Sequence, residues 1–140
     1  MKAVDLDDAE ALRAIDKHGM LDLYLGIADN VAKALELARE LEFPEAVGLR
    51  TGEIRYSFPP DGLVVTGMGG SAIGGKLLRD LLRDSLRAPI TMCEDYHLPS
   101  HVGPRYLLVA ISYSGNTEET LSAFVEALKR KCMTVGISSG

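Results

Sequence analysis

From residue 63 onward, short apolar runs alternate with segments whose apolar residues recur at helical spacing. The apolar runs predict four strands, at residues 63–66, 90–93, 106–111 and 133–137. Helices are predicted after the first and third strands, at residues 71–86 and 116–130. Strands with apolar residues at consecutive positions are buried on both faces, and their alternation with helices is typical of a doubly wound parallel sheet. The pattern therefore predicts an α/β fold.

The first 62 residues lack this alternation. Residues 9–15 predict a short helix behind two capping aspartates, and residues 20–41 carry apolar side chains at intervals of three and four, which indicates an amphipathic helix. Residues 43–62 are rich in proline and glycine and show no sustained period. We expect them to form a connector that ends in a tight turn.

A domain boundary is expected at the end of this connector. The N-terminal helices and the connector make up residues 1–62, and residues 63–140 make up the subdomain that contains the sheet. Residues 138–140 come directly after the fourth predicted strand, where a doubly wound sheet continues into a further loop and helix. We therefore expect the sheet of this 140-residue chain to be incomplete at its C-terminal side.

The composition limits which partners the chain can bind. It has 20 acidic and 15 basic side chains and a net charge of -5, whereas nucleic-acid-binding domains usually carry a basic surface. Its longest apolar stretches are far shorter than the roughly 20 residues of a membrane-spanning helix. The acidic residues among the first twenty do not fit a signal peptide. We expect a cytoplasmic protein that binds neither nucleic acid nor membranes.

Neither the cysteines nor the histidines form a metal-binding pattern. Cys93 and Cys132 lie in apolar runs without the paired spacing of a zinc site, so we expect buried, reduced thiols. His97 and His101 are four residues apart, as helical ligand pairs often are, but Pro99 between them argues against a helix. The sequence therefore predicts no metal site.

A glycine-rich loop joins the first predicted strand to its helix, with the sequence Gly67-Met68-Gly69-Gly70-Ser71-Ala72-Ile73-Gly74-Gly75-Lys76. Glycines let backbone N–H groups approach a ligand closely, and the start of the helix adds partial positive charge. The expected ligand is therefore an anion. A loop that serves only the close packing of the helix is the alternative.

Two nucleotide-binding interpretations compete for the same loop. Residues 70–76 fit the G-x-x-x-x-G-K pattern of triphosphate-binding loops, but Leu77 stands where that pattern needs serine or threonine. The third strand also ends in Ser112, where a magnesium-binding aspartate would be expected. The segment Gly67-x-Gly69-x-x-Ala72 fits the dinucleotide fingerprint, with Glu94 as the candidate ribose-binding acid. The dinucleotide interpretation stays open on this loop alone.

A hydroxyl-rich loop follows the third predicted strand and opens the next helix, with the sequence Ser112-Tyr113-Ser114-Gly115-Asn116-Thr117-Glu118-Glu119-Thr120. Three of its hydroxyl groups, on Ser112, Ser114 and Thr117, lie within six residues, and the N–H groups of the helix start point the same way. This donor set suits a single phosphate group. The alternative is helix capping by Ser114, Asn116 or Thr117, and we expect some capping in either case.

The expected strand order brings the two loops together. In a doubly wound sheet of order 2-1-3-4, the flavodoxin-like order, the first and third strands are neighbours and their helices leave on opposite faces of the sheet. Both loops then lie at the carboxyl ends of adjacent strands. The sequence therefore predicts one ligand-binding crevice between them, at the point where the strand order reverses.

Together these loops resemble the sugar isomerase (SIS) domain, and more narrowly the amino-terminal part of the bifunctional phosphoglucose/phosphomannose isomerases of archaea and some bacteria. The segments 16–21 and 96–99 are similar to the same family, so the resemblance extends from about residue 12 to the end of the chain. It implies that the phosphate of a sugar phosphate is held by Ser71, Ser112, Ser114 and Thr117. It also implies that two glycines offer backbone near the sugar, namely Gly69 and Gly70.

The resemblance implies an aldose–ketose isomerase of glycolysis and gluconeogenesis that forms homodimers and uses no metal or other cofactor. Such enzymes interconvert glucose 6-phosphate or mannose 6-phosphate with fructose 6-phosphate through an enediol. In the family, the glutamate base, the histidine and the lysine come from later parts of the chain. We therefore assign no catalytic residue, expect the 140-residue chain alone to be inactive, and leave the preference for glucose or mannose open.

Two alternatives belong to other functional classes. SIS modules also serve as non-enzymatic regulators that bind sugar phosphates, but the acidic first forty residues do not resemble a DNA-binding helix pair. The nucleotide-binding domain of a dehydrogenase is disfavoured by the hydroxyl-rich segment 112–120.

Overall fold

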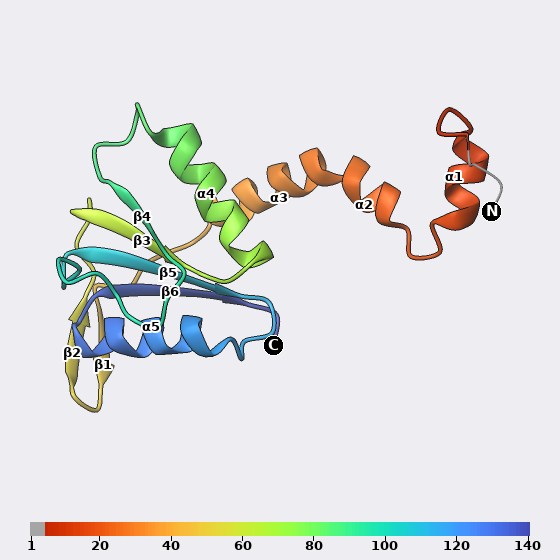
Figure 1. The fold of residues 1–140 in the computed structure, drawn as a ribbon. Coiled ribbons are helices and arrows are strands. Elements are labelled where there is room, and N and C mark those ends of the chain that lie inside the picture. The colour runs from red at the N-terminus through yellow and green to blue at the C-terminus, as the bar shows by residue number, and fades with distance from the viewer. Residues whose placement is uncertain (1–4) are drawn as a thin grey trace. The chain divides into compact units, whose positions relative to one another are not determined.

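The computed structural model describes residues 5–140, and the chain divides into two compact units, Met1–Glu42 and Phe43–Gly140. Among the described residues, the regular elements of the first unit are all helices, and the second unit contains both sheets (Figure 1). None of the helices in the described part of the chain has the length and apolar content that a bilayer-spanning helix needs.

From residue 5 onward, the first unit contains three helices, α1 (Ala9–Ile15), α2 (Met20–Leu25) and α3 (Ile27–Arg39). The predicted cap of the first helix is confirmed, because the carboxylate of Asp8 accepts hydrogen bonds from the N–H groups of Glu10 and Ala11 at 3.0 Å. The prediction of one continuous helix over 20–41 is wrong. The helix is interrupted at Gly26, whose weak helix propensity allows a turn there.

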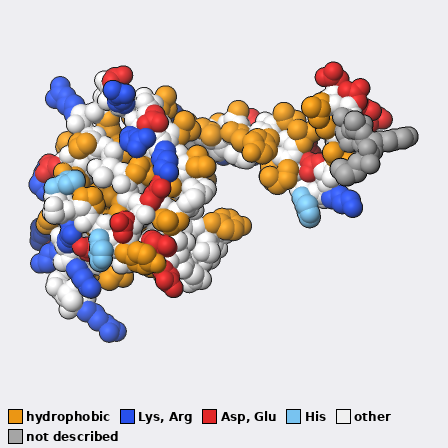
Figure 2. Space-filling model, in the orientation of Figure 1, with side chains coloured by type: hydrophobic (Ala, Val, Ile, Leu, Met, Phe, Trp, Pro, Cys, Tyr) orange, Lys and Arg blue, Asp and Glu red, His pale blue; other side chains and the backbone are white. Residues whose placement is uncertain are grey.

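No residue of these three helices is buried. Apolar side chains of α2 and α3 lie at the surface (Figure 2), and the most exposed of them are Leu23, Tyr24, Leu25, Val31, Leu35 and Leu37. The amphipathic pattern of this segment therefore predicted helices correctly, and their apolar side chains are unburied within the unit.

The segment 43–62, expected to be a connector, contains a β-hairpin. Strand β1 (Ala46–Leu49) pairs antiparallel with β2 (Gly52–Arg55). Ile54 is buried to 1% exposure, and Tyr56, just after the hairpin, donates a hydrogen bond from its hydroxyl to the carbonyl of Thr134 at 2.8 Å. The hairpin is thus stabilised by contacts that are distant in sequence, which local spacing does not reveal.

The second unit is built on four parallel strands in the order β4-β3-β5-β6. The strands are β3 (Gly62–Thr66), β4 (Ile90–Cys93), β5 (Tyr106–Ser112) and β6 (Met133–Ser138). The two central strands are the most deeply buried, because helices cover the sheet on both sides. The predicted α/β class and the predicted order 2-1-3-4 are confirmed.

Helix α4 (Gly70–Leu82) lies on one face of the sheet and α5 (Glu118–Lys129) on the other (Figure 1). Gly75 of α4 packs against Val65, whereas Ala123 and Ala127 of α5 belong to the main core cluster. Small residues at these positions let both helices approach the strands closely. The helix predicted to reach residue 86 ends at Leu82.

The two cysteines lie in or beside the core and are free thiols, as expected. Both are buried, and burial is the main factor that raises the pKa of each thiol. Neither thiol is therefore activated for nucleophilic chemistry.

Candidate functional site

The loops after β3 and β5 meet at the carboxyl edge of the sheet, where α4 and α5 begin. An open pocket of about 560 Å³ lies there, a volume within the usual range for small-molecule sites. It is lined by Met68, Gly70, Ser71, Ile111, Tyr113, Ile137, Ser138 and Ser139. The first loop, the end of β5 and the end of β6 therefore share one crevice.

The glycine-rich loop packs tightly against the end of β5. A Cβ added to Gly67 would lie 2.8 Å from the carbonyl oxygen of Ile111, so no larger residue fits there without a backbone shift. The N–H groups of Ser71 and Ala72 donate to carbonyls of the same loop. The N–H groups of Ser71 and Ala72 are therefore not free to bind a ligand. The side chain of Ser71 is partly exposed and lines the pocket.

The hydroxyl-rich loop is held together by its own side chains. The hydroxyl groups of Ser112 and Thr117 are hydrogen-bonded to each other at 2.9 Å, and Ser112 is buried to 6% exposure. Ser114 accepts a hydrogen bond from the N–H of Asn116 at 3.3 Å. Two of the three predicted hydroxyl groups are thus brought into direct contact.

Helix α5 begins without a side-chain cap, contrary to our expectation of some capping. Thr117 occupies the N-cap position, but its hydroxyl bonds Ser112 rather than an N–H group of the first turn. The first N–H groups of a helix have no partner within the helix. The first turn of α5 therefore has N–H groups without an intrahelical partner and partial positive charge, and it also carries the acidic side chains of Glu118 and Glu119.

The predicted site residues do not all line the same pocket. Gly70 and Ser71 line the 560 Å³ pocket, and Ser112 lines a smaller pocket of about 140 Å³ that shares Ile137 and Ser138 with the larger one. Gly69 precedes α4 as its N-cap residue. Ser114 and Thr117 line neither pocket.

Sequence analysis missed the end of β6 as a part of the site. Ser138 is the register partner of Ser112, and Ser138 and Ser139 both line the larger pocket. The predicted strand order contained the necessary signal, because a fourth strand beside the third must end at the same edge of the sheet.

Thr120 was also missed. Its side chain is buried to 3% exposure, and its hydroxyl has no hydrogen-bond partner within the described residues. It lines the 140 Å³ pocket together with Ser112 and Ser138. A buried, unpartnered hydroxyl is uncommon in folded proteins, and it adds a polar group beside the start of α5.

Each nucleotide-binding interpretation assigns a ligand-binding role to a charged side chain, and these two side chains form an ion pair with each other. Lys76 of α4 forms an ion pair with Glu94, just after β4, and both side chains remain partly exposed. Neither residue lines the larger pocket. Within the described residues there is no group of three His, Cys, Asp or Glu side chains that could hold a metal ion.

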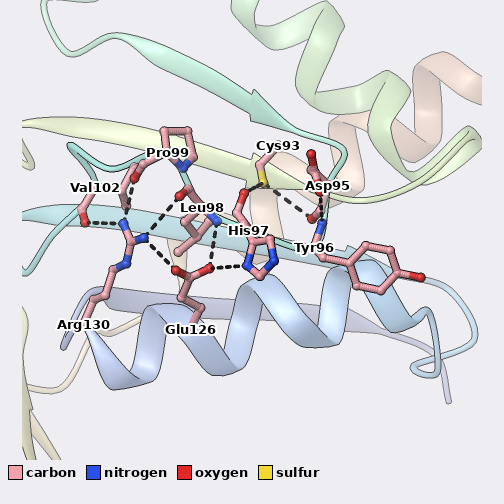
Figure 3. A network of polar contacts seen from close by, with 9 residues as sticks. All are labelled: Cys93, Asp95, Tyr96, His97, Leu98, Pro99, Val102, Glu126 and Arg130. Carbon is pink, nitrogen blue, oxygen red and sulfur yellow. Dashed lines mark hydrogen bonds and ion pairs between the residues drawn. The ribbon is translucent and has the colours of Figure 1, made fainter.

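The loop after β4 is attached to α5 by a network of polar contacts (Figure 3). Glu126 accepts a hydrogen bond from the N–H of Leu98 at 2.9 Å and pairs with Arg130 at 2.6 Å. Arg130 donates to the carbonyls of Pro99 at 2.7 Å and Val102 at 3.1 Å. These contacts hold the loop after β4, which has no regular secondary structure, against α5.

His97 and Tyr96 lie in this loop beside acidic side chains of α5. The imidazole of His97 is 3.7 Å from the carboxylate of Glu126 and is largely exposed. The negative charges of Glu119 and Glu118 raise the pKa of the Tyr96 hydroxyl. The acidic residues of the first turn of α5 thus interact with the loop, and none of them lines the larger pocket.

Comparisons with known proteins give one consistent result. No protein-family model matches the chain. The chain is 36% identical over 121 residues to the bifunctional phosphoglucose/phosphomannose isomerase of Caldicellulosiruptor bescii, a match that covers 86% of the chain and 33% of the relative. Proteins of the same name from Thermoplasma acidophilum and Aquifex aeolicus are 38% identical over 105 residues and 46% identical over 82 residues.

These two matches cover 71% and 58% of the chain, and 33% and 26% of the relatives. The chain therefore spans about a third or less of the length of the curated relatives that it matches.

Proposed function

The chain belongs to the bifunctional phosphoglucose/phosphomannose isomerase family, and we propose that it forms the phosphate-binding part of a sugar-phosphate isomerase. The proposed protein interconverts glucose 6-phosphate or mannose 6-phosphate with fructose 6-phosphate. We assign residues 63–140 to its first SIS subdomain, with the hairpin segment 43–62 in the same compact unit and the helices of residues 1–42 before it in the sequence.

The observation that carries this proposal is the uncapped start of α5 beside the hydroxyl pair of Ser112 and Thr117. A phosphate dianion accepts several hydrogen bonds at once, and bonds to a charged acceptor are stronger than those between neutral groups. In our proposal Ser112, Ser114 and Thr117 hold the phosphate together with the first N–H groups of α5. Ser71 completes the cradle from the start of α4.

The larger pocket is suited to the sugar. Gly70 lines this pocket, and Gly69 is the residue before Gly70 in the chain. Because glycine has no Cβ, a ligand in the pocket can approach the backbone there closely. Isomerisation moves a proton between C1 and C2 through an enediol, which requires a base and a group that opens the ring. The residues that line the pocket include no carboxylate, imidazole or amine.

We therefore assign binding and orientation of the sugar phosphate to this chain and no catalytic residue. Each proton-transfer group typically contributes about 10²- to 10⁴-fold to a rate. The 140-residue chain alone is accordingly proposed to lack appreciable isomerase activity. The proposed whole protein is a cytoplasmic homodimer that needs no metal.

Isothermal titration calorimetry of the chain with glucose 6-phosphate and with glucose tests the proposal. The double variant Ser112→Ala/Thr117→Ala should bind glucose 6-phosphate about tenfold more weakly or worse, because it loses two hydrogen bonds to a charged group. The matched control is Ser85→Ala/Thr51→Ala, which removes the same atoms from exposed positions outside the pocket. Equal affinity of the parent chain for the phosphorylated and unphosphorylated sugar would contradict the proposal.

A further inference from the structure

The last residue of β6 and the residue after it line the larger pocket, together with residues of the glycine-rich loop. Ser138 and Ser139 form this part of the pocket wall, and Ser71 lines the pocket from the start of α4. Three serines from two separate segments therefore face one space of about 560 Å³.

Backbone contacts attach this segment to the hydroxyl-rich loop. Ser138 pairs with Ser112 in the register of β5 and β6, and the N–H of Ser139 donates to the carbonyl of Tyr113 at 3.2 Å. Gly115 has a φ of +70°, and a Cβ at that position would collide with the terminal carboxylate of Gly140 and approach the hydroxyl of Ser138 at 3.1 Å. The wall is therefore positioned by the same loop that we propose to hold the phosphate.

The two serines of the wall have different hydrogen-bonding roles. The hydroxyl of Ser138 donates to a terminal carboxylate oxygen of Gly140 at 2.8 Å and accepts from the N–H of Gly140 at 3.3 Å, so it is engaged with its own chain. The side chain of Ser139 forms no such bond with another described residue, and this residue is exposed. Its hydroxyl is available to a ligand as donor and as acceptor.

The chemistry of the pocket indicates what Ser139 can bind. Apart from the hydroxyls of the serines and Tyr113, its side chains are apolar, namely those of Met68, Ile111 and Ile137. No charged side chain lines it, so a second anionic group would find no counter-charge there. Neutral hydroxyl groups on a carbon chain match this combination of serine hydroxyls and apolar surface.

We propose that Ser139 hydrogen-bonds a hydroxyl group of the sugar chain and that Ser138, whose hydroxyl is engaged with its own chain, is the positioning residue beside it. This inference rests on the proposed function, because it places the phosphate of the same ligand at the start of α5. Ser139 then discriminates a sugar phosphate from phosphate alone.

Calorimetry of the 140-residue chain with two probes, glucose 6-phosphate and inorganic phosphate, tests this role. Ser139→Ala should weaken glucose 6-phosphate binding by about three- to tenfold, the usual effect of one neutral hydrogen bond, and change phosphate binding by less than about twofold. Ser139→Thr keeps the hydroxyl and should bind both probes nearly as the parent does. Ser85→Ala, at an exposed position outside the pocket, is the control and should also match the parent.

The remaining outcomes count against the inference in different ways. If the parent binds both probes and Ser139→Ala binds both with unchanged affinity, the role of Ser139 is wrong while the proposed function stands. If Ser139→Ala weakens the binding of both probes equally, Ser139 has a structural role only. The same conclusion follows if Ser139→Thr, which keeps the hydroxyl, binds glucose 6-phosphate as weakly as Ser139→Ala does. A parent chain that binds neither probe overturns the proposed function and this inference together.

Discussion

At the scale of single residues, two adjacent glycines of α4 have opposite environments. A Cβ on Gly75 would lie 2.6 Å from Cγ1 of Val65 and 3.0 Å from Cε of Met92, whereas a Cβ on Gly74 would meet nothing within 4 Å. Gly75→Ala should therefore lower the free energy of unfolding by about 1–3 kcal/mol, because overpacking outweighs the gain in helix propensity. Urea denaturation measures the change.

Gly74→Ala is the matched control for that experiment. It adds the same methyl group one position away, on an exposed part of the helix, and should raise the free energy of unfolding by up to about 1 kcal/mol through helix propensity alone. Equal effects of the two substitutions would show that α4 does not pack on β3 through Gly75.

The residues of the candidate site were only partly predictable. Ser112 and Thr117 are five positions apart around a turn, so their proximity follows from the loop sequence. The part played by Ser139 depends on the pairing of β6 with β5, a contact between distant segments. Thr120 lies inside a helix, where its position on the buried face depends on how α5 packs against the sheet.

At the scale of elements, the contacts of Glu126 and Arg130 join α5 to the loop after β4. Both side chains are about three-quarters buried, and Glu126 bonds one backbone N–H and one guanidinium. Glu126→Gln should lower the free energy of unfolding at pH 7 by about 1–3 kcal/mol, because hydrogen bonds to a charged carboxylate are replaced by neutral ones. Glu36→Gln, at an exposed position on α3, is the control.

This effect should depend on pH in one direction. The N–H of Leu98, followed by Arg130, holds the pKa of Glu126 below its ordinary value of 4.5. A carboxyl group with a lowered pKa stabilises the fold above its unfolded-state pKa, and that contribution is lost as the pH falls through the folded-state value. The difference between parent and Glu126→Gln should therefore shrink below about pH 4.5. A difference that grows on acidification would contradict this assignment.

Among the elements, the parallel strands were predictable because their burial on both faces leaves continuous apolar runs in the sequence. The β1–β2 hairpin was not, because it is only four residues long in each strand and is held by Ile54, Tyr56 and contacts to β6. The interruption at Gly26 was hidden because the apolar spacing continues across it.

At the scale of the whole molecule, α4 carries an apolar stripe on the side away from the sheet. Ile73, Leu77 and Leu81 are 62%, 68% and 74% exposed and follow one another at intervals of four residues. Exposed apolar stripes of this kind favour association, and a net charge of -5 opposes it only weakly. We expect the 140-residue chain to sediment as a dimer or larger species at micromolar concentration.

Leu77→Gln/Leu81→Gln should shift that equilibrium toward the monomer, since it removes two of the three apolar side chains of the stripe. Leu25→Gln/Leu37→Gln changes equally exposed leucines of α2 and α3 and serves as the control. A parent chain that sediments as a folded monomer, or equal effects of both double variants, would show that the stripe on α4 does not mediate association.

The parallel four-stranded sheet also has a consequence for how the chain is expected to fold. Leu63 pairs with Ile90, Leu107 with Met133, and Gly62 with Tyr106, so every pairing joins strands separated by a long crossover segment. Only the hairpin, in which Leu49 pairs with Gly52, can close locally, within about 1–10 μs. The central pairing of β3 with β5 spans the longest segment, which includes the connections β3–β4 and β4–β5. We therefore expect the edge that carries the candidate site to be completed late in folding, because closing the longest loop has the largest entropic cost.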